Sequence, residues 1–370
     1  LASVSSKNVF GELQFGRLAG RVGLENLGNS CFMNAGLQCL SHIEPFAAFF
    51  LSGKYKDEVN RSSASGCKGE LADAFAELQG VLWRSEQPQH RPTSFREQLQ
   101  RVRPDLFQGH EQQDVQEFLA FCLDGLHEDL NRVPERPEPL TLEEEREDER
   151  VGEPRGEEFV AALSWMRYLE HGRSFIVDLM QGQLRSTLSC VECGHRSRRF
   201  EAFLYLSLPV SWDMCNVSDA LAAYLAEETL TGDEQWFCEK CQKKVDARKK
   251  IDIWKLPPVL VIHLKRFEHD SATGRFRKIG RHLAMPHGVD LSEFCSSTQA
   301  HGANYDVTCV ANHRGRFDSG HYTATCYMGS RFFEFDDTEV RRLSKHADIV
   351  GAHAYVLFLV RRSPTEGYFV

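Results

Sequence analysis

Residues 23–34 read GLENLGNSCFMN, and this stretch places a cysteine at the predicted start of a helix. Apolar residues recur after it at helical spacing, and Asn29 or Ser30 is a suitable N-cap residue. Cys31 would then lie in the first helical turn, where unpaired backbone amides and the helix dipole favour a thiolate. Because a lone cysteine is more often a small core residue, a catalytic interpretation needs partner residues elsewhere in the chain.

Two candidate partners for Cys31 lie near the other end of the sequence. The stretch 312–324 reads NHRGRFDSGHYTA and separates two strand-like runs, so His321 should stand at the start of a strand. A third apolar run, FFEFDD at 332–337, ends in two carboxylates. A thiol nucleophile needs a base, and the base needs an acceptor that fixes its tautomer. Cys31, His321 and Asp336 supply these roles, although His321 or Asp336 taken singly could be an ordinary strand-end or turn residue.

Four of the twelve cysteines form two Cys-x-x-Cys pairs, Cys190 with Cys193 and Cys238 with Cys241. Each pair can place two thiolates on one tetrahedral metal ion, and four thiolates make a closed structural zinc site. A redox disulfide is the alternative for either pair, but two such pairs together favour metal. We therefore expect one structural zinc ion and no organic cofactor, and a reducing compartment for the protein.

The composition limits the class of protein. The chain has 370 residues and 42% hydrophobic content, which is enough for a large core and exceeds one typical domain. The net charge of −9 argues against general nucleic-acid binding and suits a basic partner. No apolar run is long enough to span a bilayer, and no signal-peptide pattern is present. The sequence begins at Leu1 without an initiator Met, so we expect a piece of a longer protein.

Several long motifs in this order resemble the ubiquitin-specific proteases, a family of papain-like cysteine deubiquitinases. The resemblance extends from about residue 21 to residue 362. It implies an α+β, papain-like fold with a helical thumb, a palm and zinc-bearing fingers. The stretches that carry it are the cysteine box at 23–34, QDVQEF at 113–118, HLKRF at 263–267, and the histidine box at 312–324 with Phe-Asp-Asp at 335–337.

The organisation expected on this basis has five parts. Within the helical part, apolar residues recur at steps of three and four over 115–130, which predicts an amphipathic helix. Residues from about 134 to 158 are rich in Pro, Glu, Asp and Arg, so we expect a mobile acidic insertion that lacks the apolar side chains needed for a core. The predicted parts are an arm at 1–20, the thumb at 21–175, the fingers at 176–250, the palm at 251–362 and a tail at 363–370.

The resemblance also implies roles for individual residues. Asn26 would supply an oxyanion-hole amide beside the backbone N–H of Cys31. Asp337 would support the nucleophilic water or the oxyanion site, unless it only caps a turn. Asp114 and Glu117 would face the basic C-terminal tail of ubiquitin, although acids at a helix start also complement the helix dipole.

Three further residues near His321 complete the predicted substrate-binding set. His313 is a competing candidate for the base, but it lacks the glycine-flanked strand start of His321. We therefore expect His313 beside the substrate tail or in supporting packing. Gly320 and Tyr322 flank His321, and the loop 314–319 is a candidate gate over the tail.

The sequence thus predicts a deubiquitinase whose Cys-His-Asp triad cleaves the bond after the C-terminal glycine of ubiquitin through a thioester. The expected partners are ubiquitin and ubiquitinated proteins, with no nucleic acid and no membrane segment, and we expect a monomer in the cytoplasm or nucleus. Two alternatives remain. One is a catalytically silent ubiquitin-binding scaffold, and the other is a protease for another ubiquitin-like modifier or a general papain-like endopeptidase.

Overall fold

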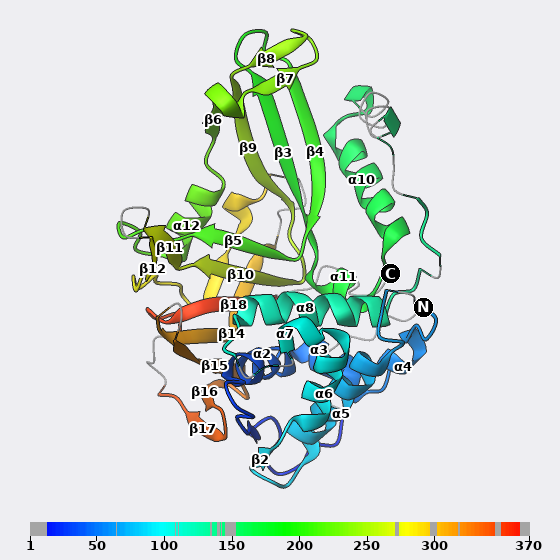
Figure 1. The fold of residues 1–370 in the computed structure, drawn as a ribbon, viewed down its shortest axis with the longest axis vertical. Coiled ribbons are helices and arrows are strands. Elements are labelled where there is room, and N and C mark those ends of the chain that lie inside the picture. Colours follow the sequence, from blue (N-terminus) through cyan, green and yellow to red (C-terminus); the bar gives the residue numbers. More distant parts are fainter. Residues whose placement is uncertain are drawn as a thin grey trace.

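The computed structural model describes residues 13–63, 65–107, 109, 111–133, 135–138, 141, 143–144, 153–270, 274–296, 302–316, 319–344 and 349–362. The predicted tail, most of the predicted arm, and part of both the acidic insertion and the gate loop lie outside these residues. Figure 1 shows three parts: a group of helices, a large sheet beside it, and a long narrow sheet that extends away from both.

The first part consists of helices and of a short parallel pair of strands, β1 (Gly23–Leu24) and β2 (Gln89–His90). In the described part of the chain, no helix is both long and apolar enough to cross a bilayer. The helices of this part are α2 (Cys31–Ser41), α3 (Glu44–Leu51), α4 (Tyr55–Glu58), α5 (Glu70–Arg84), α6 (Thr93–Val102), α7 (Pro104–Phe107), α8 (Val115–Asp129) and α11 (Phe175–Met180). A further helix, α10 (Glu157–His171), lies instead beside the narrow sheet, against its strand β4 (Arg196–Phe203) (Figure 1).

The amphipathic helix expected over 115–130 is α8. Asp114 is its N-cap residue, and its side chain accepts hydrogen bonds from the backbone amides of Gln116 and Glu117. Such a cap satisfies amides that have no partner within the helix. The apolar stripe is buried as its spacing predicts, and its members are Val115, Phe118, Leu119, Cys122, Leu126 and Leu130.

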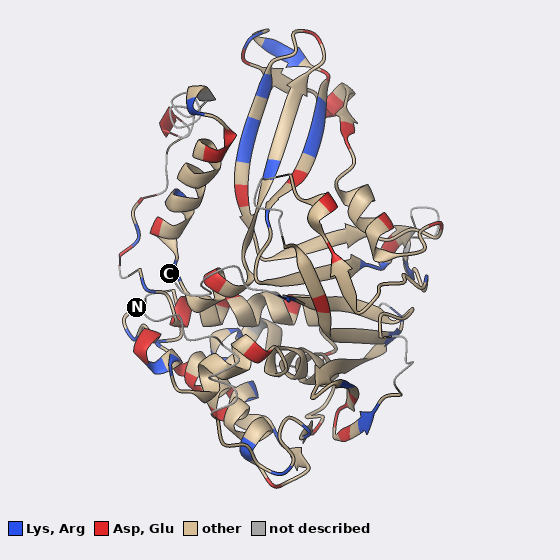
Figure 2. Cartoon of the chain, turned by 180° about the vertical axis from the view of Figure 1, so that it is seen from behind, with Lys and Arg blue, Asp and Glu red and all other residues tan. Residues whose placement is uncertain are grey.

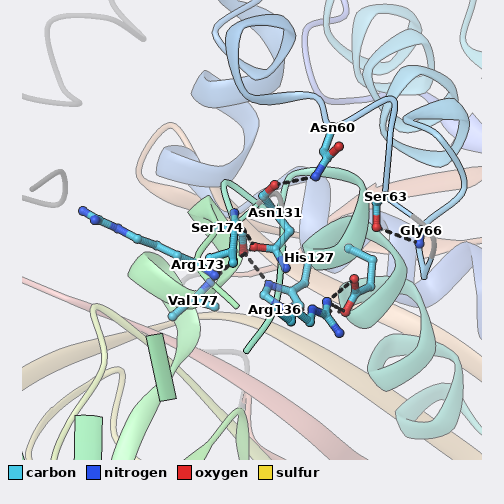
Figure 3. Close-up of polar contacts among 11 residues, drawn as sticks. Asn60, Ser63, Gly66, His127, Asn131, Arg136, Arg173, Ser174 and Val177 are labelled. Carbon is cyan, nitrogen blue, oxygen red and sulfur yellow. Dashed lines mark hydrogen bonds and ion pairs between the residues drawn. The ribbon is translucent and has the colours of Figure 1, made fainter. Parts of the chain in front are cut away.

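The C-terminal end of α8 is anchored by polar contacts, which Figure 3 shows. His127 Nδ1 lies 2.8 Å from Ser174 Oγ, and that hydroxyl caps α11 by accepting from the amide of Val177. Asn131 Oδ1 accepts from the amide of Arg173, while its backbone oxygen accepts from Asn60. These bonds join α8, α11 and the loop before α5 into one rigid support.

The large sheet has eight strands, in the order β17-β16-β15-β14-β18-β10-β5, with β13 beside β14. The strands predicted at 259–264 and 354–360 are β10 and β18, which pair with each other antiparallel. Its strands are β5 (Tyr205–Pro209), β10 (Val259–Lys265), β13 (Gly288–Asp290), β14 (Asn304–Gly315), β15 (Gly320–Met328), β16 (Arg331–Asp336), β17 (Glu339–Arg342) and β18 (Ala354–Arg361). The helix α12 (Val217–Tyr224), the hairpin β11 (Phe267–Asp270) with β12 (Arg275–Lys278), and a short 3-10 helix (Ser292–Phe294) accompany this sheet.

The narrow sheet has the strand order β4-β3-β9-β6, and the hairpin β7–β8 stands at its far end (Figure 1). In Figure 2, segments coloured for Lys and Arg are frequent on its long strands and at its tip, so charged residues of the two signs are unevenly distributed along the chain. The predicted fingers range, 176–250, includes β5, yet β5 pairs in parallel with β10 in the large sheet. The strands are β3 (Gly182–Cys190), β4 (Arg196–Phe203), β6 (Glu228–Leu230), β7 (Trp236–Cys238), β8 (Lys243–Val245) and β9 (Ala247–Lys255).

The helix that follows the cysteine box, α2, lies between the two larger parts. All eleven of its residues are buried. It packs against α8 on one side and against β14, β15 and β16 on the other. A helix enclosed in this way is held rigidly, so its first residue, Cys31, has a defined place beside the strand β15.

Candidate active site

Cys31 is the first residue of α2, and the preceding loop is shaped by side-chain bonds to its own backbone. Asn26 Oδ1 accepts from the amides of Gly28 at 3.0 Å and Ser30 at 3.1 Å. Ser30 stands at the N-cap position, but its hydroxyl accepts from the amide of Leu27 at 2.7 Å and makes no cap bond into the helix. The hydroxyl of Ser30 therefore stabilises the loop before α2 and not the first turn of the helix.

Cys31 as a whole residue is only 4% exposed. Burial is the largest influence on its pKa and raises it above the usual value, and the nearby charge of Asp337 raises it further. The backbone amides of Tyr322, Phe32 and Cys31 itself act in the opposite direction but are outweighed. The expectation that the helix start would favour a thiolate is therefore wrong for this state of the protein, because the local sequence does not reveal how deeply Cys31 is buried.

His321 and Asp336 are brought together from neighbouring strands. His321 is the second residue of β15, Asp336 is the last of β16, and Nε2 of the imidazole lies 2.6 Å from Asp336 Oδ1. A carboxylate at this distance holds the proton on Nε2, so Nδ1 of the neutral ring is free to accept one. Among the described residues, no hydrogen bond joins Cys31 to His321, so the imidazole is oriented by Asp336 but is not bonded to the thiol.

Asn26 and Asp337 meet beside this pair. Asn26 Nδ2 donates to Asp337 Oδ2 at 2.9 Å, while its oxygen is occupied by the loop amides described above. One hydrogen of the Asn26 amide remains, since the group carries two. Asp337 lies in the turn between β16 and β17 with a φ of 50°, and its backbone oxygen accepts from the amide of Leu24.

Asp114 is more strongly engaged than the sequence indicates. In addition to capping α8, it accepts hydrogen bonds on Oδ2 from Tyr355 at 2.6 Å and from Tyr322 at 3.3 Å. Burial and the charge of Asp114 raise the pKa of both tyrosine hydroxyls, which therefore stay protonated and able to donate. Glu117 is exposed in the first turn of α8. The predicted contact of either acid with a basic tail stays a prediction.

His313 is buried, 3% exposed, and is held by Lys278. Lys278 Nζ lies 3.0 Å from His313 Nδ1 and donates to its backbone oxygen at 2.5 Å. Burial and the charge of Lys278 lower the pKa of His313 to about 4, so the ring is neutral at neutral pH. This arrangement favours the supporting role over the role of base. A side chain at Gly320 would place its Cβ 2.0 Å from His313 Nε2, so only glycine fits there.

Several contributors to this region were missed from sequence. They are Tyr355 and Lys278, the buried Asn34 of α2, and Gln112, whose Oε1 accepts from the amide of Gly320 at 2.9 Å. Gln112 directly precedes a motif that did stand out, and Asn34 ends the cysteine box itself, although neither was given a role. Tyr355 and Lys278 come from other segments and carry no local signal.

The four predicted metal ligands also converge. Cys190, Cys193, Cys238 and Cys241 place their sulfur atoms within 4.8 Å of one another at the end of the narrow sheet. Sγ of Cys190 is 3.9 Å from that of Cys241, and Sγ of Cys193 is 3.7 Å from that of Cys238. Tetrahedral zinc with bonds of about 2.3 Å requires sulfur separations of roughly 3.8 Å. The cluster therefore fits one zinc ion, while the cysteines are all unpaired.

Comparisons with known proteins agree on one family. The model of the family described as "Ubiquitin carboxyl-terminal hydrolase" matches residues 22–359. Ubiquitin carboxyl-terminal hydrolase 2 of Rattus norvegicus is 36% identical over 352 residues, which cover 93% of this chain and 54% of that protein. Ubiquitin carboxyl-terminal hydrolase 21 of Homo sapiens is 35% identical over 353 residues, which cover 92% of this chain and 61% of that protein. This chain thus spans little more than half the length of these relatives.

Solved structures share the fold. A SAGA DUB module, Ubp8/Sgf11/Sus1/Sgf73 bound to monoubiquitin, matches with a TM-score of 0.72 and 24% identity, over 96% of this chain and 73% of that chain. The same module bound to ubiquitin aldehyde matches with a TM-score of 0.70 and 25% identity, over 95% of this chain and 71% of that chain. The predicted α+β, papain-like fold is confirmed, and the chain belongs to the ubiquitin carboxyl-terminal hydrolase family.

Proposed function

We propose that this chain is the catalytic part of a cysteine-type deubiquitinase that cleaves the bond after the C-terminal glycine of ubiquitin. The observation that carries the proposal is the pairing of His321 Nε2 with Asp336 Oδ1 at 2.6 Å in a member of this family, with Cys31 at the start of the adjacent buried helix. Names and titles of the relatives refer to ubiquitin, and the charge, fold and site of this chain agree with such a substrate.

The reaction proceeds in two halves. Nδ1 of His321 takes the proton of Cys31, and the sulfur attacks the carbonyl carbon of the terminal glycine. Asp336 stabilises the imidazolium that forms and keeps it aligned. The oxyanion accepts from the backbone amide of Cys31 and from the remaining N–H of Asn26. His321 then protonates the departing lysine amine, which leaves a thioester.

Hydrolysis of the thioester completes the cycle. His321 removes a proton from water, and the hydroxide attacks the thioester carbonyl carbon and releases ubiquitin with a free carboxylate. Cys31 recovers its proton from His321. Because burial raises the pKa of Cys31 and no hydrogen bond joins it to His321 among the described residues, entry of the ubiquitin tail is the step that brings the thiol and imidazole into contact in this mechanism.

The four cysteines at the end of the narrow sheet would hold one zinc ion. Four thiolate ligands leave no open position for water or substrate, so the ion is structural. It would tie the β7–β8 hairpin to the end of β3. We also propose that the protein is a monomer and that it is located in the cytoplasm or nucleus, where thiols stay reduced.

Intact mass tests the activity. Wild type and Cys31→Ala are each mixed with ubiquitin that carries a C-terminal electrophile. An adduct of one ubiquitin on wild type and none on the variant supports the proposal. Absence of an adduct on folded, zinc-loaded wild type would favour the silent binding scaffold, and preferential adducts with another ubiquitin-like modifier would reassign the substrate.

A further inference from the structure

Asn34 lies one helical turn after Cys31, and its side chain is almost completely buried, 2% exposed. Its Nδ2 donates to Asp337 Oδ1 at 2.8 Å and faces the backbone oxygens of Leu24 at 3.3 Å and Glu25 at 3.2 Å. All three neighbours are acceptors, so the NH₂ group must face them and the amide cannot be reversed. Within the described part of the chain, the buried Oδ1 of Asn34 has no hydrogen-bond partner.

This orientation costs free energy, since a buried amide oxygen without a partner is unfavourable. The cost indicates that the position of Nδ2, and not full satisfaction of the side chain, is what matters at Asn34. The principal recipient is a charged oxygen of Asp337, and a bond to a charged acceptor is stronger than one to a carbonyl oxygen.

Asp337 is held on both carboxylate oxygens. Oδ1 accepts from Asn34, and Oδ2 accepts from Asn26 at 2.9 Å. Its turn is pressed against β1, because a Cβ on Gly23 would lie 2.3 Å from the backbone oxygen of Thr338. The carboxylate is therefore clamped between an amide of the catalytic helix and an amide of the loop before it.

Without this clamp, Asp337 could reach the base. One ring nitrogen of His321 and one carboxylate oxygen each of Asp336 and Asp337 all lie within 4.8 Å of one another. Two carboxylates are therefore close to one imidazole. Only Asp336 is hydrogen-bonded to it, at 2.6 Å. The two amides keep Asp337 turned toward Asn26.

We infer that Asn34 is a positioning residue: it holds Asp337 against Asn26, which keeps Asn26 aimed at the developing oxyanion and leaves Asp336 to serve His321. The inference rests on the proposed function, because only acyl transfer creates an oxyanion at this place. Asn34 itself touches neither substrate nor the reacting atoms.

The same helix offers a matched control in Gln38. Gln38 is 1% exposed, its Nε2 donates to the backbone oxygen of Val22 at 2.9 Å, and its Oε1 is likewise buried without a described partner. It resembles Asn34 in burial, chemistry and the segment it contacts, but it does not contact Asp337. Gln38→Leu therefore imposes comparable structural damage without releasing the carboxylate.

The experiment compares Asn34→Leu, Gln38→Leu and wild type in two reactions of Cys31. The first is hydrolysis of ubiquitin that carries a C-terminal fluorogenic amide. The second is alkylation by iodoacetamide at alkaline pH, a displacement at saturated carbon that develops no oxyanion. For Asn34→Leu we expect kcat to fall about 10- to 100-fold with KM within about threefold. Alkylation should stay within about threefold of wild type, and Gln38→Leu should leave both reactions within the same margin.

Three results would overturn the inference: an unchanged kcat in Asn34→Leu, an equal loss in both variants, or a parallel loss of alkylation. If wild type itself does not hydrolyse the C-terminal amide of the ubiquitin substrate, the proposed function is wrong, independently of the role of Asn34. A crystal structure of Asn34→Leu then decides the positioning role. Asp337 should have left Asn26, and a retained contact between them would contradict it.

Discussion

The hydroxyl of Tyr355 donates a 2.6 Å hydrogen bond to Asp114 Oδ2 and thereby joins β18 of the large sheet to the start of α8. The same carboxylate caps α8 through its other oxygen and accepts a second bond from Tyr322, the neighbour of His321. Asp114 therefore connects the helical part to the sheet next to His321, whatever it contributes to substrate recognition.

Asp114→Ala and Asp114→Asn separate these two roles. Alanine removes the cap and the acceptor for both tyrosines, so the free energy of unfolding should fall by about 2–3 kcal/mol. Asparagine keeps an acceptor oxygen but removes the charge, so it should cost about 1 kcal/mol and raise KM for ubiquitin about tenfold. Urea unfolding and steady-state kinetics measure the two effects. If Asp114→Asn leaves KM unchanged, the predicted contact with the basic tail is wrong and Asp114 is structural.

Asp129, at the end of α8, is a second buried acid with a structural task. It is 0% exposed, and its two oxygens accept from the backbone amides of Cys67, Gly69, Leu71 and Ala72 around the start of α5. Asp129→Ala should lower the free energy of unfolding by about 3 kcal/mol, because it leaves four amides at a helix start without their acceptor. Asp124→Ala, an exposed change on the same helix, should cost less than about 0.5 kcal/mol. Similar costs for the two variants in urea unfolding would contradict this assignment.

The sequence predicted those features that depend on local pattern. Helical spacing predicted α8, the two Cys-x-x-Cys pairs predicted the sulfur cluster, and the strand-like runs predicted β14, β15 and β16. The order of the motifs and the resemblance they carry predicted the fold class. Each of these signals lies within a short window, where periodicity or spacing expresses the physical requirement directly.

Features that depend on distant segments escaped prediction. The pKa of Cys31 is raised mainly by burial, and the sequence at 23–34 does not indicate that burial. Asn34 belongs to the cysteine box, but the box does not reveal its contact with Asp337, which lies about three hundred positions away. The pairing of β5 with β10 crosses the predicted border of the fingers for the same reason, since strand pairing depends on packing throughout the sheet.

Zinc content tests the sulfur cluster. Purified protein should contain about one zinc ion per chain by elemental analysis, and chelation should lower the melting temperature. Cys193→Ser removes one of four ligands and should lower both zinc content and stability, whereas Cys215→Ser, at an exposed cysteine outside the cluster, should change neither. Full stability of the metal-free protein would refute a structural role for the ion.

Acid sensitivity should arise partly at His263 on β10. Burial lowers its pKa to about 4, well below the usual 6.5, while Nδ1 is bonded to Ser207 Oγ at 3.1 Å. Between these two values the unfolded state binds more protons than the folded state, so stability is complete above pH 6.5 and is lost as the pH falls toward 4. His263→Phe should weaken this loss between pH 7 and pH 5 by about 1–2 kcal/mol in urea unfolding. An identical acid slope in wild type and variant would place the sensitivity elsewhere, for instance at His313, whose pKa is lowered in the same way.

The protonation of Cys31 can be followed by alkylation, with exposed Cys215 as an internal reference. Since burial raises the pKa of Cys31, iodoacetamide should label it more slowly than Cys215 near neutral pH, and its rate should continue to rise above about pH 9. Asp337→Asn removes a charge that raises this pKa, so the profile should move to lower pH while burial, the larger cause, keeps it above that of an exposed thiol. Peptide mass spectrometry over a pH series measures both profiles. A wild-type midpoint below about pH 7 would instead show that a thiolate–imidazolium pair exists before ubiquitin binds, as the helix-start argument alone predicts.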